Sequence, residues 1–416
     1  MLENGSAASG SRPENIRYNN CRAVLGLFCH TDRLSVHEIT ERFNLSKTAT
    51  MNIINFLLST GIIYLYGKGE PVGTSGKKPS LYALNPSYKY SVVAGIEGDY
   101  IVAELLDFRL NKINFYLHRA YDRSYKAFIE GASIAVKHVL DRAKLTGKDL
   151  YAIALYTGGI VDAKSGVLLR PITHSDWDND LPVVRDLKSA LDFDVPVYMD
   201  NVCRFGGYFE LLKRPDNWNL TILSLFIDEN GVGGSLIQNG TIARGKNGLI
   251  GEFGHITTNY TMAEKCKCGR YGCFETVVTG SRVVERARKA LATAKTPSSA
   301  QHSIKRIGDL FAHADNGDAF ARSQLDFVAE QFANMLYNMQ IMYDPDMVII
   351  QGLYASSGTY FKQKLSQAVN ELSLYSIAKG LRLIFDEFDF REAVTIGASF
   401  YCREQFINSD SLFDMT

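Results

Sequence analysis

The alternation of hydrophobic and polar positions divides the chain into a short helical N-terminal part and a longer body that mixes helices and strands. In the N-terminal part, apolar residues recur three and four positions apart, which is typical of amphipathic helices. The helices predicted in this way span 15–29, 36–43 and 47–59.

A short turn separates the second and third of these helices. Ser35 and Glu38 stand three residues apart at the start of the second helix, which is the spacing of a capping box. Asn44 and Leu45 fit a tight turn, and Ser46 can cap the helix that follows. Two helices joined in this way, with small polar residues early in the second, are typical of a helix-turn-helix that reads the major groove.

The next segment predicts a β-hairpin that completes a winged helix. Apolar runs at 62–66 and 81–84 flank a loop at 67–80 that is rich in Gly and Lys, and lysines at the tip of such a wing suit phosphate contacts. A small helical domain that binds another protein is the alternative, but the order of the elements and the basic wing favour DNA. The predicted DNA-binding residues are Ser46, Lys47, Thr48, Thr50, Asn52, Lys77 and Lys78.

The body contains two successive sets of strand and helix patterns. The first set has strands at 91–97, 101–107, 112–118 and 150–156 and a helix at 124–145. The second set has strands at 220–227, 234–238 and 347–350 and helices near 276–293, 319–343 and 391–406. Two such sets predict two α/β lobes with a ligand cleft between them.

These patterns suggest a division into domains. We expect a flexible start at 1–11 and a winged helix-turn-helix domain at 12–87, ending at a hinge around Pro86. The first α/β lobe is predicted to comprise 91–200 together with 392–416, and the second lobe to comprise 201–391. The C-terminal segment would therefore return to the first lobe.

Composition argues against a membrane protein and against a secreted one. The chain has 416 residues, of which 46% are hydrophobic and 22% charged, as in ordinary globular proteins of two or three domains. No apolar run approaches the roughly 20 residues that span a bilayer, and 1–11 lacks the apolar core of a signal peptide, so we expect a cytoplasmic protein. The net charge is zero, but 12–85 carries nine Lys and Arg against five Asp and Glu, which hints at a polyanionic partner.

The cysteines are unevenly distributed. Three of the seven fall within eight residues, shortly after a histidine, and three thiolates with one imidazole are the donors of a closed zinc site. Core packing is an alternative, and so are disulfides, although these need an oxidising compartment. The scattered cysteines are Cys21, Cys29, Cys203 and Cys402. The predicted zinc ligands are His255, Cys266, Cys268 and Cys273.

Two motifs resemble the signatures of the ROK family, which comprises repressors, open reading frames and kinases. One is the segment 252–255, and the other is a Cys-x-Cys-Gly-x-x-Gly-Cys-x-Glu run that ends at Glu275. The resemblance extends from about residue 12 to the C-terminus, with further matches at 159–162, Trp177, 231–234, 344–346 and 397–398. It implies a two-lobed actin-like, ribonuclease-H-like sugar-kinase fold, preceded in the repressor branch by a winged helix-turn-helix domain.

The resemblance also implies an effector site. In the family, residues matching Glu252, His255 and Glu275 hold sugar hydroxyls, for which carboxylates are suitable acceptors, and Gly159 matches a backbone contact. If zinc binds one nitrogen of His255, the other can face the ligand. A family Asn is replaced by Thr173, which bears on the identity of the sugar. The predicted effector-binding residues are Gly159, Asp200, Asn201, Glu252, His255 and Glu275.

The parts that handle ATP in the kinases of this family differ here. At 97–101 an Asp and a Tyr stand in the first phosphate loop, and Glu229 replaces the leading Gly of the second loop. The kinase Asn-Asp pair, whose Asp is the base, corresponds to Asp200 and Asn201; the simplest alignment puts Asn201 at the base position, and a one-residue shift would restore Asp200. A Gly-Gly pair has become Gln-Gly at 351–352. These differences argue against phosphoryl transfer.

The sequence therefore predicts a sugar-responsive transcriptional regulator rather than an enzyme. We expect a repressor of carbohydrate genes that binds operator DNA as a homodimer or tetramer and responds to a sugar or sugar phosphate. Two alternatives remain open: an active ATP-dependent sugar kinase with a DNA-binding domain, and a regulator with a vestigial pocket.

Overall fold

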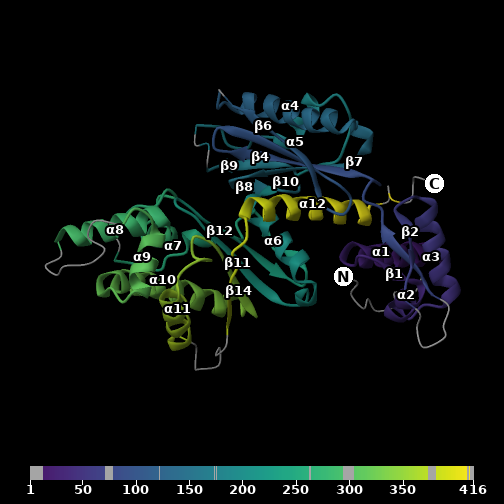
Figure 1. Cartoon of the computed structure of the whole chain (residues 1–416). Coiled ribbons are helices and arrows are strands. Elements are labelled where there is room, and N and C mark those ends of the chain that lie inside the picture. Colours follow the sequence, from purple (N-terminus) through teal and green to yellow (C-terminus); the bar gives the residue numbers. More distant parts are fainter. Residues whose placement is uncertain are drawn as a thin grey trace. The chain divides into compact units, whose positions relative to one another are not determined.

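The computed structural model describes residues 13–409 apart from gaps at 71–77, 121, 173, 175, 262–263, 294–303 and 373–380, and it also describes Leu412. Side chains are described from Tyr18 onward. The chain forms two compact units (Figure 1). Unit 1 runs to Pro215 and resumes at Thr395, and unit 2 comprises Asp216–Val394. The limits that the sequence predicts for the winged helix-turn-helix domain and for the two lobes stay a prediction.

Unit 1 begins with a winged helix-turn-helix fold, as the sequence predicts. Three helices accompany a small antiparallel sheet with the strand order β1-β3-β2 (Figure 1). The elements are α1 (Pro13–His30), β1 (Leu34–Ser35), α2 (Val36–Phe43), α3 (Lys47–Ser59), β2 (Ile63–Lys68) and β3 (Ser80–Leu84).

Local hydrogen bonds explain where α2 and α3 begin and end. The Ser35 hydroxyl accepts from the Glu38 N–H at 3.3 Å, and the Glu38 carboxylate accepts from the Ser35 N–H at 2.7 Å, which confirms the capping box. Asn44 ends α2 in the left-handed conformation, with φ of 49°, which Asn adopts more readily than most residues. The Ser46 hydroxyl accepts from the Ala49 N–H at 3.1 Å and so caps α3.

The rest of unit 1 is built on a five-stranded sheet with the order β10-β7-β4-β5-β6. Strands β4, β5 and β6 are antiparallel, whereas β7 and β10 run parallel to β4. Helix α4 packs on one face of the sheet (Figure 1). Helix α12 contacts the sheet through the hydroxyls of Ser91 and Ser399, which are 2.6 Å apart. The elements are β4 (Tyr90–Glu97), β5 (Tyr100–Leu106), β6 (Lys112–Arg119), α4 (Tyr125–Ala143), η1 (Gly147–Asp149), β7 (Leu150–Thr157), β8 (Gly159–Asp162), β9 (Val167–Pro171), α5 (Val183–Ala190), β10 (Val197–Asn201), α6 (Val202–Lys213) and, from Thr395 onward, α12 (Phe390–Asn408).

Unit 2 repeats this strand arrangement in the order β13-β12-β11-β14-β15. Strands β11, β12 and β13 are antiparallel, and β14 and β15 follow in parallel. The repeat confirms the prediction of two actin-like α/β lobes. The elements are η2 (Pro215–Asn217), β11 (Thr221–Ile227), β12 (Val232–Gln238), β13 (Thr241–Ile242), η3 (Phe253–His255), α7 (Phe274–Val278), α8 (Gly280–Thr293), α9 (Ile307–Asp315), α10 (Ala319–Tyr343), β14 (Met347–Gly352), α11 (Thr359–Glu371) and β15 (Arg382–Phe385).

Each unit has its own apolar core. The core of unit 1 includes Val136 of α4 and Leu155 of β7, and the core of unit 2 includes Phe332 of α10 and Leu225 of β11; all four are at most 1% exposed. Burying such a side chain stabilises the fold by about 1.5–3 kcal/mol. Within the described residues, no helix combines the length and the apolar character needed to cross a membrane.

The helix expected at 276–293 is in fact two helices, α7 and α8, which meet at Thr279. The N–H of Gly280 donates to the Asp228 carbonyl at 3.1 Å, so α8 begins against the turn between β11 and β12. A Cβ atom on Gly280 would lie 2.4 Å from the carboxylate of Glu229. A larger residue at position 280 would therefore require the Glu229 side chain to move.

Candidate functional site

One imidazole and three thiols converge in unit 2, just before α7. The donor atoms of the four predicted metal ligands all lie within 4.8 Å of one another. The His255 Nδ1 is 3.5 Å from the Cys266 Sγ, and the Cys268 and Cys273 sulfurs are 3.6 Å apart. The structure therefore brings together a group that could hold a metal ion.

These separations suit tetrahedral coordination. Zinc–sulfur bonds of about 2.3 Å and zinc–nitrogen bonds of about 2.0 Å place neighbouring donors roughly 3.5–3.8 Å apart. The two short separations in the cluster fall in this range. All seven cysteines are free, and 3.6 Å between the Cys268 and Cys273 sulfurs far exceeds a disulfide bond of about 2.05 Å. The disulfide alternative therefore has no support.

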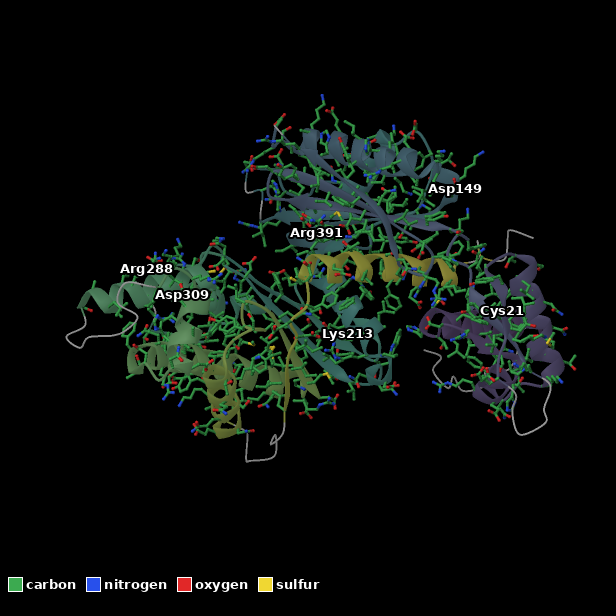
Figure 2. All side chains as sticks on the ribbon, in the orientation of Figure 1. Cys21, Asp149, Lys213, Arg288, Asp309 and Arg391 are labelled. Atoms are coloured by element: carbon green, nitrogen blue, oxygen red, sulfur yellow. The ribbon has the colours of Figure 1, made fainter. Side chains whose placement is uncertain are left out.

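The scattered cysteines differ from the cluster in their surroundings. Cys21, labelled in Figure 2, lies among the helices of the N-terminal domain and is 1% exposed. Cys203 and Cys402 are also buried, and Cys29 is half-buried. Burial raises the pKa of Cys29 to about 11, so its thiol stays protonated at neutral pH.

Backbone hydrogen bonds hold the histidine segment against the cysteine loop. The Thr258 N–H donates to the Gly272 carbonyl at 2.9 Å, and the Phe274 N–H donates to the Ile256 carbonyl at 2.8 Å. Gly272 has φ of 72°, and a Cβ atom there would lie 2.0 Å from the Asn259 carbonyl oxygen. Only glycine fits this crossing without displacing the backbone.

The protonation chemistry of the thiols is consistent with a cation site. Burial raises the pKa of Cys273 to about 12 and also raises the pKa of Cys266. Burial would raise the pKa of Cys268 as well, but hydrogen bonds from the Arg270 N–H and the neighbouring thiols outweigh it and lower that pKa. A bound dication would supply the charge that deprotonates thiols packed this closely.

Two carboxylates border the cluster, as the sequence suggests. The Glu275 Oε1 lies 4.0 Å from the Cys266 sulfur, and its Oε2 accepts from the Val232 N–H at 3.3 Å. The Glu252 Oε2 lies 4.0 Å from the His255 Nε2. His255 thus turns Nδ1 toward the sulfurs and Nε2 toward an acid. The side chains of Glu252 and His255 are 23% and 28% exposed, so a ligand can reach both.

A small cavity of about 140 Å³ adjoins the cluster. Its polar lining includes Asn230, Cys266, Glu275, Thr276 and Arg282. Of the effector-binding residues predicted in unit 2, Glu275 is the one that lines this hollow. Its position between a thiol and an open polar surface suits a carboxylate that accepts hydrogen bonds from a hydroxylated ligand.

The three effector-binding residues predicted in unit 1 lie together but are engaged with the protein. Asp200 is fully buried, and its Oδ1 accepts from the Arg204 Nη1 at 2.9 Å and from the Asn201 N–H at 2.8 Å. The Asn201 Oδ1 accepts from the Cys203 N–H at 2.8 Å and so caps α6. The Asn201 Nδ2 donates to the Gly159 carbonyl at 2.9 Å. The dipeptide therefore has a structural role at the start of α6.

The turn between β11 and β12, which corresponds to the second phosphate loop of the kinases, is closed by Asp228. One oxygen of its carboxylate accepts from the N–H groups of Asn230, at 2.8 Å, and Gly231, at 2.7 Å. In phosphate loops such N–H groups bind phosphate oxygens. Asp228 was not predicted from the sequence, which pointed to Glu229, although Asp shortly before Asn-Gly is a signal for an Asx turn.

The first phosphate-loop position also carries acidic side chains. The Glu97 carboxylate accepts from the Tyr156 hydroxyl at 2.9 Å. Asp99 is exposed on the β4–β5 turn and forms an ion pair with Arg123. Gln351, at the Gly-Gly position of the kinases, is 3% exposed and accepts from the Ser224 hydroxyl at 3.3 Å.

The DNA-binding residues predicted from the sequence are mostly accessible. Exposed positions at the start of α3 and beside the wing are Ser46, Lys47, Thr48, Asn52 and Lys78. Lys77 lies outside the described residues. The exposed residues of α3 occupy the part of a recognition helix that meets base edges in other helix-turn-helix domains.

Thr50 does not share this exposure, which contradicts the prediction that it contacts DNA. Its side chain is fully buried, its hydroxyl lies 3.1 Å from that of Thr40, and it donates to the Ser46 carbonyl at 3.2 Å. Position 50 stands four residues before Ile54, so both lie on the face of α3 that packs inward. Thr50 thus ties α2 to α3 and cannot reach a base.

Strand β2 of the wing exposes two tyrosines and a leucine, which the strand pattern of the sequence did not predict. Tyr64, Leu65 and Tyr66 of β2 are 41%, 55% and 52% exposed. The Arg33 guanidinium lies 5.1 Å from the centre of the Tyr66 ring, within the range of a cation–π contact. Exposed tyrosines close to an arginine are the feature from which a nucleic-acid-binding surface could have been predicted at this strand.

The sequence profile of the ROK family matches residues 96–399, which is well over half of the chain. The protein therefore belongs to the ROK family. The match covers both phosphate-loop positions and the metal cluster, and it begins after the winged helix-turn-helix domain.

The relatives include enzymes and regulators. A glucokinase from Halalkalibacterium halodurans is 28% identical over 236 residues, which are 56% of this chain and 70% of that protein. A xylose repressor from Caldicellulosiruptor bescii is 25% identical over 374 residues, which are 88% of this chain and 90% of that protein. A solved ROK family transcriptional regulator, described as a homolog of the E. coli Mlc protein, has a TM-score of 0.77 over 94% of this chain and 97% of its own, with 19% identity. That regulator shares the fold of both the N-terminal domain and the body.

Proposed function

We propose that this protein is a transcriptional regulator that represses carbohydrate genes and whose DNA affinity responds to a sugar or sugar phosphate. The observation that carries the proposal is the combination of a winged helix-turn-helix with a ROK body in which Asp228 takes the phosphate-loop N–H groups. Similarity to a xylose repressor along 88% of the chain supports it. Binding to chromosomal DNA would place the protein in the cytoplasm.

In this proposal α3 is the recognition helix. Thr48 and Asn52 offer hydrogen-bonding groups to base edges, and Lys47 offers a charge to phosphate. The wing adds Lys78, together with the Arg33–Tyr66 pair, as a second contact area. A homodimer or tetramer would bind a palindromic operator, since two recognition helices then meet two half-sites.

Three contacts support the loss of kinase activity. Asp228 occupies N–H groups that would bind phosphate, and Arg204 neutralises the buried Asp200. Asn201, the other candidate for the base position, is an amide that caps α6 and cannot accept a proton near neutral pH. Phosphoryl transfer needs hydrogen-bond donors in fixed positions around the phosphate and a base that accepts a proton. In this proposal the three contacts leave neither the donors nor the base available for catalysis.

We propose zinc as the metal held by His255, Cys266, Cys268 and Cys273, because three thiols and one imidazole form a set that zinc prefers. The metal would fix the loop that carries His255 and Glu275. His255 would then present Nε2, beside Glu252, to a ligand hydroxyl. The effector site of unit 2 would thus consist of Glu252, His255 and Glu275.

The test is binding of the purified protein to DNA fragments from upstream of its own gene and of neighbouring carbohydrate genes. We expect a protected, sequence-specific footprint, and an affinity that falls steeply with salt because phosphate contacts release counterions. A panel of sugars and sugar phosphates should contain one that changes this affinity by about 5–150-fold. Absence of any specific footprint would refute the proposal.

The alternatives have their own measurements. The glucokinase similarity motivates a coupled assay of ATP-dependent phosphorylation across common hexoses, in which we expect no turnover. A vestigial pocket would show no thermal stabilisation by any sugar. A true effector at 100 times its dissociation constant should stabilise the protein by about 2.7 kcal/mol.

A further inference from the structure

A cavity in unit 1 lies away from both the metal cluster and the phosphate-loop positions. It measures about 380 Å³, and pockets of about 300–1,000 Å³ commonly hold small ligands. Its walls come from the winged helix-turn-helix domain and from the body of the same unit. They include Phe28, Cys29, Asp32, Arg109, Leu212 and Arg403.

Arg403 is the central feature of this cavity. Its side chain is 1% exposed, and its Nη1 and Nη2 donate to the carbonyls of Phe108, at 3.0 Å, and Cys29, at 3.5 Å. Its Nε has no partner among the described residues. Both acceptors are neutral, and among the described residues no carboxylate is recorded at hydrogen-bonding distance of this buried guanidinium, which is costly inside a protein.

The acids near Arg403 compensate its charge only in part. Asp32 pairs with Arg109 at the edge of the cavity, but its side chain is 88% exposed and therefore well screened by solvent. Glu404 follows Arg403 in the chain, and burial raises its pKa although Arg403 opposes this. Arg109 adds a second guanidinium to the wall. The cavity therefore presents positive charge.

The remaining lining suits the body of an organic molecule. Apolar surface comes from four further lining residues: Phe28, Leu84, Leu212 and Pro215. A binding site of this kind, with an apolar wall and a few directed donors, is typical of small metabolites. Guanidinium groups bind carboxylates and phosphates with paired hydrogen bonds.

We propose that this cavity binds a small organic anion, a phosphorylated or carboxylated metabolite up to about the size of a hexose phosphate. Its anionic group would accept from Arg403 and Arg109, and its body would lie against Leu212. The site is separate from the effector site proposed at Glu252, His255 and Glu275. Because the ligand would contact the end of α1 and also α12, its binding would strengthen the contact between the winged helix-turn-helix domain and the body of unit 1.

Isothermal titration of the full-length protein tests the proposal without DNA. The probes are inorganic phosphate, a hexose 6-phosphate and citrate, each compared with chloride at the same ionic strength. We expect at least one of them to bind with a defined stoichiometry. Tightest binding of the hexose phosphate would indicate a site for a sugar phosphate, and tightest binding of citrate would indicate a site for a carboxylate. Tightest binding of inorganic phosphate would indicate a site for the free ion.

Variants locate the site. Arg403→Met should weaken binding at least 10-fold, and Leu212→Trp, which fills the cavity and keeps both arginines, should do the same. Arg142→Met is the matched control, because Arg142 is exposed on α4 and outside the cavity lining, and it should change the dissociation constant less than 2-fold. Glu275→Gln should also bind normally.

Three results would overturn the proposal. One is binding of none of the three anions above the chloride control. Another is undiminished binding by folded Leu212→Trp, which decides the matter even if Arg403→Met fails to fold. Loss of binding in Glu275→Gln alone would place the anion at the effector site of unit 2 and would also overturn it. None of these outcomes depends on whether the protein binds an operator.

Discussion

The Arg204 guanidinium donates to the Asp200 carboxylate at 2.9 Å, with both side chains almost completely withdrawn from solvent. The two residues are four positions apart, across the start of α6. Asp200 is one of the two residues that the family resemblance offers as a catalytic base. Its pairing with a buried arginine indicates that it holds the fold of unit 1 together instead.

Removing Asp200 should therefore destabilise the protein strongly. In Asp200→Ala, the buried Arg204 would lose the carboxylate to which its Nη1 donates, and we expect the free energy of unfolding to fall by about 3–5 kcal/mol. Chemical denaturation monitored by circular dichroism measures this. The control is Asp99→Ala, which breaks the exposed pair with Arg123 and should cost less than about 1 kcal/mol. Equal, small effects of both changes would contradict a structural role for Asp200.

The metal cluster predicts a specific effect of Cys268→Ser. Cys268 is exposed, so the substitution disturbs little packing, but it removes one of the four donors. We expect the protein to be purified with much less than one zinc per chain and to lose its response to the effector, because the loop carrying His255 and Glu275 is no longer fixed. Elemental analysis and thermal shift measure the two effects.

Cys203→Ala provides the control for the metal analysis, because Cys203 lies in unit 1 and outside the cluster. It should retain zinc at the wild-type level. A zinc-free Cys268→Ser protein with a full effector response would show that the metal does not organise the site.

Two glycines of the cysteine loop provide a matched test of backbone geometry. Both have positive φ, 72° at Gly272 and 90° at Gly269, but a Cβ atom meets the Asn259 carbonyl at 2.0 Å at Gly272 and nothing within 4 Å at Gly269. Gly269→Ala should cost only about 1–2 kcal/mol, the strain of the left-handed conformation. Gly272→Ala should cost more and should lower zinc affinity, because the histidine segment must move away. Thermal unfolding with and without a chelator compares them.

On α3, Lys47 and Thr50 should respond to substitution in opposite ways. Lys47→Ala should weaken operator binding and reduce the slope of log affinity against log salt by about 1, with little change in stability, because an exposed phosphate contact is lost. Thr50→Val should lower the free energy of unfolding by about 1 kcal/mol through its lost hydrogen bonds, with folded protein binding DNA normally. Fluorescence anisotropy at several salt concentrations measures the affinity. A loss of affinity confined to Thr50→Val would restore it as a contact residue.

Much of the fold could be predicted from local patterns. The capping box at Ser35 and Glu38 and the apolar periodicity of α3 depend on residues within a few positions, so helix-turn-helix boundaries follow closely from the sequence. The metal ligands were predictable for a similar reason, because three cysteines and a histidine of suitable chemistry occur within 19 positions, 255–273. The break between α7 and α8 was not, since it depends on contact with the distant turn at Asp228 and Glu229.

The sequence by itself determined the element types, the donor chemistry of the metal cluster and the resemblance to the ROK family, because these reside in short-range spacing and residue type. Only the tertiary structure decided how polar side chains are used. By its chemistry, the Asp228 carboxylate could bind a ligand, the Asp200 carboxylate could accept a proton and the Thr50 hydroxyl could contact a base of DNA. In the folded protein each of these groups instead forms hydrogen bonds with a neighbouring residue. The positive cavity at Arg403 also arises from segments far apart in the chain, whose charges meet only after folding.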